Sequence, residues 1–394
     1  MGRIVKRALS ALMLALCCAG LSGCGGQEIE SCLFVISMAV DPAPDGNMTV
    51  TVKALSGSQE SPAQTGAASG APDQQTQEGS ALEDSEPGYI VLSATAPSCL
   101  RALNLLASTT PRTLNLSQLR EIVLSETLAR SGAALSALRE IHSLYRANSS
   151  AVVVVTPDDA GDFIRRQHAL LGVRLSQYLD VLFEHYAQMD LIPPRAMLSA
   201  VIADMESSTA DAAAVYAAGN AFDSTLVLPQ SPETDRLPGH LPRTSPAQNE
   251  YLGSAVFSGA HMTGTLTGSE TGLLCLMSGQ ARTRTAVFGG TQYRVDLPTR
   301  VRRSIDGGAL CVDISMQLTR TAGASAHAAG GVASQTEMDC VQLLERLQAM
   351  GSDVLGFGGY AVRGYADIPS WEASGWAQAY AGAPVRVRVR VRIP

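Results

Sequence analysis

The pattern of apolar and polar residues predicts its clearest strand at the end of the chain. Valine and arginine alternate over residues 385–393, the period of two that places successive side chains on opposite faces of a sheet. Two β-rich runs, residues 32–40 and 48–55, flank a segment of prolines, aspartates, glycine and asparagine. Such a segment between two β-rich runs predicts a hairpin.

Between residues 89 and 205 the pattern switches repeatedly between the strand and helix periods. Short β-branched runs predict strands at residues 89–94, 119–124 and 151–156. Apolar residues at helical spacing predict helices at residues 100–106 (with Ser98 as the N-cap), 133–146, 175–189 and 194–205. This alternation predicts a sheet with covering helices.

Beyond residue 250 the pattern changes character. Strands are predicted at residues 253–257, 283–288, 300–304, 310–318 and 385–393. Helices are predicted at residues 270–277, 336–350 and 370–379, the last bearing tryptophans. The expected fold class is therefore α+β and multi-domain, with mixed β-sheets and packed helices.

Length and composition divide the chain further. Its 394 residues, 46% of them hydrophobic, exceed what one ordinary core organises. Residues 56–88 hold almost no large apolar side chain, which predicts a disordered insertion, and the four prolines of residues 231–249 indicate a linker. We expect a signal peptide at 1–23, an N-terminal α/β domain at 24–170, a small middle domain with the linker at 171–249, and a C-terminal α+β domain at 250–394.

The first residues have the pattern of a secretion signal. Three basic residues precede an apolar run over residues 8–19, which is too short to span a bilayer. The sequence Leu21-Ser22-Gly23-Cys24 then matches the bacterial lipobox. This predicts that residues 1–23 are removed and that Cys24 receives a diacylglycerol, whose two acyl chains anchor a protein stably. Plain secretion is the alternative.

Charge and cysteine content exclude several functions. The formal net charge is −7, and removing the three basic residues of 1–23 leaves 26 basic against 36 acidic residues, or −10. This disfavours a nucleic-acid binder. Only Lys6 and Lys53 are lysines, which leaves little place for Schiff-base chemistry. Beyond Cys24, five cysteines in mostly apolar surroundings indicate buried thiols over a disulfide framework.

Candidate catalytic and metal-binding residues have simpler structural explanations. The six histidines are scattered, with no metal-ligand spacing. Asp158 and Asp159 follow a predicted strand and precede a helix, where acids cap the helix more often than they catalyse. Asp41 and Asp45 suggest calcium, but the prolines between them favour a turn. We therefore expect no enzyme activity, metal or cofactor.

Two further motifs leave alternatives open. Residues 356–361 fit the dinucleotide pattern G-x-G-x-x-A, but they follow a helix instead of a strand, so the context is wrong. The arginines of the last strand could face anionic lipid headgroups or an acidic partner. Alternatively they form a solvated face or pair with the chain's own acids.

The order of motifs resembles one family, the Ger(x)C lipoproteins of spore germinant receptors. The C-terminal third carries the resemblance: a long helix, an aspartate with a Gly-x-Gly, a tryptophan-bearing helix and a final valine-and-basic strand. The matching residues are Asp353, Gly356, Gly358, Trp371 and Trp376. Near the lipobox, Glu28-Ile29 also match, whereas Gly25 and Gly26 stand where Trp and Asp are usual.

The resemblance implies a function that does not involve catalysis. Such proteins are C subunits, lipid-anchored on the outer face of the inner spore membrane, with a fold of three domains. They act with membrane A and B subunits in nutrient-triggered germination. The alternative function is a substrate-binding lipoprotein of a transporter, for which two similar lobes around a cleft are expected.

Overall fold

The computed structural model describes most of the chain. The described residues are 2, 31–56, 88–144, 147–170, 173–221, 235–242, 249–283, 285–288, 291–320 and 329–393. Cys24, almost all of the predicted signal peptide and residues 57–87 of the predicted insertion lie outside them.

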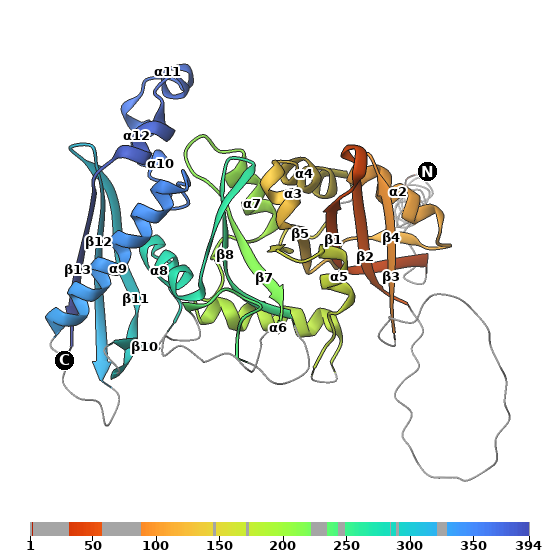
Figure 1. The fold of residues 1–394 in the computed structure, drawn as a ribbon, viewed down its shortest axis with the longest axis horizontal. Coiled ribbons are helices and arrows are strands. Elements are labelled where there is room, and N and C mark those ends of the chain that lie inside the picture. The colour runs from red at the N-terminus through yellow and green to blue at the C-terminus, as the bar shows by residue number, and fades with distance from the viewer. Residues whose placement is uncertain are drawn as a thin grey trace, which may run out of the picture.

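The largest element is a sheet of nine strands in the order β3-β2-β1-β5-β6-β7-β8-β9, with β4 paired to β1 (Figure 1). Strands β4, β1, β5, β6 and β7 are mutually parallel, and the outer hairpins on both sides are antiparallel. Their bounds are β1 (Cys32–Pro42), β2 (Met48–Leu55), β3 (Tyr89–Ala96), β4 (Thr113–Asn115), β5 (Glu121–Ser125), β6 (Val152–Thr156), β7 (Ala213–Gly219), β8 (Asn249–Ser258) and β9 (His261–Leu266).

Helices cover this sheet on both faces, because alternate residues of its strands enter two separate cores. Val153 and Val155 of β6 belong to one core, whereas Val154 belongs to the other. The first core includes α2 (Cys99–Ser108), α3 (Glu126–Ser131), α4 (Ala134–Leu144) and α7 (Leu198–Met205). The second includes α5 (Ala160–Arg165) and α6 (Leu175–Gln188).

A second sheet of four strands lies at the other end of the molecule (Figure 1). Its order is β10 (Thr285–Phe288), β11 (Thr291–Asp306), β12 (Ala309–Arg320) and β13 (Val385–Arg392). One face packs against α8 (Gly268–Ser278) and α9 (Ala329–Ala349), which share a third core with Val256 of β8 and Leu266 of β9. Three short helices precede β13: α10 (Gly358–Ala361), α11 (Ile368–Glu372) and α12 (Trp376–Gly382).

Most predicted elements are present. The predicted class of mixed sheets with packed helices is confirmed, as are the first hairpin and the helix capped by Ser98, whose hydroxyl accepts a hydrogen bond from the Arg101 N–H. The single tryptophan-bearing helix predicted at residues 370–379 is wrong. Gly375 adopts a left-handed φ of 67° and separates α11 from α12.

The nine-stranded sheet crosses two of the predicted domain boundaries. Strands β1 to β6 precede residue 170, β7 follows it, and β8 and β9 lie beyond residue 249. The division of the chain into three domains stays a prediction. No helix among the described residues combines the length and apolarity needed to cross a bilayer.

Candidate functional site

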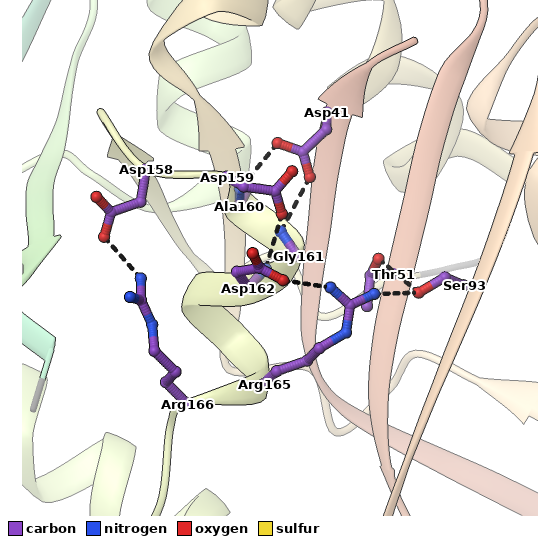
Figure 2. Close-up of polar contacts among 10 residues, drawn as sticks. All are labelled: Asp41, Thr51, Ser93, Asp158, Asp159, Ala160, Gly161, Asp162, Arg165 and Arg166. Atoms are coloured by element: carbon purple, nitrogen blue, oxygen red, sulfur yellow. Dashed lines mark hydrogen bonds and ion pairs between the residues drawn. The ribbon is translucent and has the colours of Figure 1, made fainter. Parts of the chain in front are cut away.

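Aspartates gather around the start of α5, where parallel strands end (Figure 2). Asp41 of β1 accepts hydrogen bonds from the N–H groups of Ala160 (2.8 Å) and Gly161 (2.9 Å). The first turn of a helix leaves such N–H groups without intrahelical partners, and its positive end favours a carboxylate. Burial raises the pKa of Asp41, and the two backbone hydrogen bonds oppose that shift. Asp41 therefore fastens α5 to the sheet.

The two neighbouring aspartates also bind donors of the chain itself. Asp159 is the N-cap of α5 and accepts a hydrogen bond from the Asp162 N–H at 2.8 Å, which confirms the predicted cap. Asp158 does not cap α5, so the prediction is wrong for this residue: it accepts from the Arg166 guanidinium at 2.8 Å and from the Gly219 N–H at 2.9 Å. Asp158 therefore joins α5 to β7, and these contacts give both carboxylates a structural role.

An arginine extends the cluster to the edge of the sheet (Figure 2). Arg165 donates to Asp162 at 2.7 Å and to the Ser93 hydroxyl at 2.8 Å. The Ser93 and Thr51 hydroxyls lie 2.9 Å apart across β2 and β3. The whole cluster holds α5 against β1, β2, β3 and β7.

The calcium interpretation of Asp41 and Asp45 is not supported. Asp41 is directed at α5, whereas Asp45 lies in a 3-10 turn (Pro44–Gly46) closed by a hydrogen bond from the Ala43 N–H to the Asn47 carbonyl. In the part of the chain that the structure describes, no group of three or more histidine, cysteine, aspartate or glutamate residues could hold a metal ion.

The second candidate site surrounds Asp353, just after α9. Asp353 accepts hydrogen bonds from the N–H groups of Phe357 (2.9 Å) and Gly358 (2.7 Å). Its own N–H donates to Asp211 at 2.7 Å, and Asp211 also accepts from the Gly259 N–H at 2.7 Å. Burial raises the pKa of Asp353 to about 7, against the effect of the two backbone hydrogen bonds. Asp211 and Asp353, from distant segments, thus fix the loop after α9 in place.

The glycines of the motif are required by this packing. Gly356 has a φ of 68°, a conformation that other residues rarely adopt. A Cβ on Gly358 would approach the carbonyl oxygen of Thr209 to 2.7 Å and the Trp376 indole nitrogen to 2.9 Å. These contacts explain the Gly-x-Gly by packing within the chain, without a bound dinucleotide.

The tryptophans close the same site. The Trp371 indole N–H donates to the Ser208 hydroxyl at 3.0 Å, and the rings of Trp371 and Trp376 lie 5.8 Å apart. Trp376 in turn lies 5.9 Å from Tyr380, which is buried. A groove of about 460 Å³ runs along these rings, with Ser208, Asp211 and Asp353 among its other lining residues.

The structure therefore brings Asp353, Gly356, Gly358, Trp371 and Trp376 together against residues 207–211, which follow α7. This second segment was not predicted, because Ser208 and Asp211 carry no motif of their own. Cys24 lies outside the described residues. The role of the five motif residues as a structural joint stays a proposal.

A buried polar network inside the large sheet was also missed. Lys53 is 1% exposed and donates to the Gln167 carbonyl, and Glu121 is fully buried. The Gln167 amide donates to Glu121 at 2.6 Å and to the Tyr251 hydroxyl at 2.7 Å. Burial raises the pKa of Glu121, and its hydrogen bonds, chiefly from Gln167, and nearby Lys53 oppose that shift. Lys53 follows the alternating run Thr49-Val50-Thr51-Val52 of β2, and α5 packs against this strand.

A cleft of about 310 Å³ lies where α6, the loop after it and the end of α8 meet. Phe183, Ile192 and Met197 supply apolar lining, and the pair Arg120–Asp180 (3.2 Å) lies at its charged side. Pockets of this kind, apolar with a few polar groups, are where small molecules bind.

The cysteines of the described segments are all free, as the sequence predicted. They are Cys32, Cys99, Cys275, Cys311 and Cys340, and all but Cys311 are buried. Burial raises the pKa of Cys99 and of Cys340 to about 12. These two thiols are therefore protonated at neutral pH and are poor nucleophiles.

Comparison with known proteins agrees with the resemblance seen in the sequence. Residues 25–218 match the model of the spore germination protein N-terminal domain, and residues 252–394 match the model described as spore germination B3/GerAC like, C-terminal. A solved structure, "Crystal Structure of the GerBC protein", is 12% identical, with a TM-score of 0.47, and the alignment covers 90% of this chain and 96% of that one. No curated protein matches the chain.

Proposed function

Because the chain belongs to the GerAC-like family of spore germination proteins, we propose that it is the C subunit of a nutrient germinant receptor. One observation carries this proposal: the two domain models of the family match in order and together account for nearly all of the chain after Cys24. The order of motifs found independently in the sequence supports it.

We propose further that the subunit is anchored by lipid at Cys24. The lipobox Leu21-Ser22-Gly23-Cys24 follows a basic start and a short apolar run. Two acyl chains at Cys24 would hold the folded body on the outer face of the inner spore membrane. There it would assemble with the membrane A and B subunits.

The proposed contribution to germination is contact with these subunits and not catalysis. The contacts of the candidate carboxylates support this part of the proposal. Asp41, Asp159 and Asp353 each accept hydrogen bonds from backbone N–H groups, and Asp158 also binds Arg166. Carboxylates held in this way serve the fold, in contrast to a nucleophile–base pair aimed at a substrate.

The test is a Cys24→Ala variant at the native locus of a sporulating host. We expect the variant to leave the spore membrane fraction, because the acyl chains are lost, and to reduce both germination with nutrients and co-purification with the A and B subunits. The matched control is Cys311→Ala, which removes a half-buried thiol and keeps the anchor. A Cys24→Ala protein that stays with the membrane and supports normal germination contradicts the proposal.

A further inference from the structure

Many arginine side chains lie on the outer face of the four-stranded sheet, the face that the helices leave uncovered. In β13 the valines point toward α9, and Val389 is 5% exposed. The arginines between them point the opposite way, and the Arg388 side chain is 68% exposed. The alternation seen in the sequence therefore separates an apolar face from a basic face.

Strand register extends the basic face across the sheet. Arg388 of β13 pairs with Asp313 of β12, which pairs with Arg302 of β11. In the next row, Arg390 pairs with Ser315, and Ser315 pairs with Arg300. Residues paired across strands point to the same face, so arginines of β11 and β13 flank β12 on both sides.

The face has an excess of positive charge although the protein is acidic. Seven arginines and three aspartates lie on it, which leaves four positive charges in excess: Arg294, Arg300, Arg302, Arg386, Arg388, Arg390 and Arg392, with Asp296, Asp306 and Asp313. The formal charge of the whole chain is −7. The basic charge is thus concentrated on one surface.

The aspartates neutralise few of these arginines. Three of the seven have a carboxylate nearby: Arg294 lies 3.4 Å from Asp296, Arg386 3.9 Å from Asp306 and Arg388 3.6 Å from Asp313, all loose pairs with exposed arginines. Within the described segments, no carboxylate comes within 4.0 Å of the other arginines of β13, nor of Arg300 and Arg302. A hollow of about 330 Å³ opens among Arg300, Arg302, Asp313, Ser315, Arg388 and Arg390.

We propose that this face binds the phosphate headgroups of an anionic bilayer. The guanidinium group is planar and binds phosphate oxygens with two parallel hydrogen bonds. Each basic residue close to an anionic membrane surface strengthens binding by about fivefold. Several headgroups can bind at once, because the arginines are spread over a broad sheet.

The composition of the face favours a lipid surface over a protein partner. Protein interfaces have an apolar, often aromatic centre from which charged residues are depleted. No exposed large apolar residue lies on β12, on β13 or on residues 293–296 and 298–306 of β11, and the positions between the arginines are mostly serine, threonine, glutamine and aspartate. This contact is independent of any lipid at Cys24, so its test does not depend on the anchor.

The experiment measures vesicle binding by the unlipidated mature chain, residues 24–394. Vesicles are made of equal parts phosphatidylglycerol and phosphatidylcholine, or of phosphatidylcholine alone. We expect binding only to the first, weakening as salt rises. Replacing all four β13 arginines with glutamine (R386Q/R388Q/R390Q/R392Q) should weaken binding by roughly 100-fold or more. The same four changes to lysine should retain most of it.

The matched control removes four exposed arginines elsewhere (R101Q/R130Q/R139Q/R195Q), with the same change of net charge, and should leave binding nearly unchanged. Equal binding to both vesicle types, or an unchanged affinity of the β13 glutamine variant, overturns the proposal. Release by inorganic phosphate at matched ionic strength also overturns it, since the site then selects free phosphate. If the fourfold variant does not fold, R300Q/R302Q tests the same face, and unchanged binding there overturns the proposal.

Discussion

The two sheets of this molecule differ in where their charged side chains lie, buried in one and exposed to solvent in the other. The nine-stranded sheet has helices on both faces, and its charged residues Lys53 and Glu121 are at most 1% exposed. The four-stranded sheet has helices on one face, and on the other the arginine side chains stay in solvent, with Arg386 65% exposed. A buried charge must find its partners within the chain, whereas an exposed charge is available to another molecule.

This difference separates residues that hold the fold from residues that act outward. The aspartates at α5 and at the loop after α9 are directed at backbone N–H groups, so they fix one element against another. In the described segments, the ion pairs of the outer-face arginines of β11 and β13 are with Asp296, Asp306 and Asp313 on that same face. The large sheet is therefore the scaffold, and the open face of the small sheet is the surface available for binding.

The largest expected effect is in the buried network. Lys53→Met should lower the free energy of unfolding by about 2–4 kcal/mol, because it removes the buried cation that donates to the Gln167 carbonyl and lies near Glu121. Urea denaturation measures this change. The double variant Lys53→Met/Glu121→Gln should recover part of the loss, since it removes the remaining charge. A loss below about 1 kcal/mol for Lys53→Met would mean that the buried cation contributes little to stability, and would contradict the contrast between the two sheets.

An intermediate effect is expected at the joint between the two regions. Gly358→Ala should lower the free energy of unfolding by about 1–3 kcal/mol, because the new methyl group meets backbone atoms of Thr209 that cannot move freely. The control is Gly359→Ala in the same helix, where nothing lies within 4 Å of the added carbon. Equal effects of the two variants in urea denaturation would show that the contact with Thr209 does not matter.

The smallest effect is expected on the open face. Arg390→Gln should change the free energy of unfolding by no more than about 0.5 kcal/mol, because its side chain leaves no buried partner unpaired. Urea denaturation of the Arg390→Gln and Lys53→Met variants in parallel compares the loss of an exposed cation with the loss of a buried one. A loss above about 1 kcal/mol would place Arg390 among the residues that hold the fold, and would contradict the contrast between the two sheets.

Local patterns predicted most of the elements but not how they combine. The period of two identified β13, and Ser98 located the start of α2. Strand β7 was missed because five of its seven residues are alanine or glycine, which give no β-branched signal. The pairing of β7 with β8, which unites the large sheet, depends on contacts between distant segments that no local pattern contains.

The candidate site shows the same limit. The motif order located Asp353, Gly356, Gly358 and the two tryptophans, but not Asp211, which lies 142 positions earlier and completes the joint. In the sequence, Lys53 stands out only as one of two lysines. Its burial follows from α5 packing on the second face of the sheet, which the polar–apolar alternation of β2 does not reveal.

The ladder between β7 and β8 also has a consequence for engineering. Residues matched by the N-terminal family model end at 218, yet the sheet continues through Asn249–Ser258 and His261–Leu266. In a chimera of two relatives joined between the regions that the two family models match, β7 would pair with a β8 from the other protein. An N-terminal half expressed alone would expose β7 as an unpaired edge strand, which is prone to aggregation. The natural crossover point for recombination lies after β9, near Thr267.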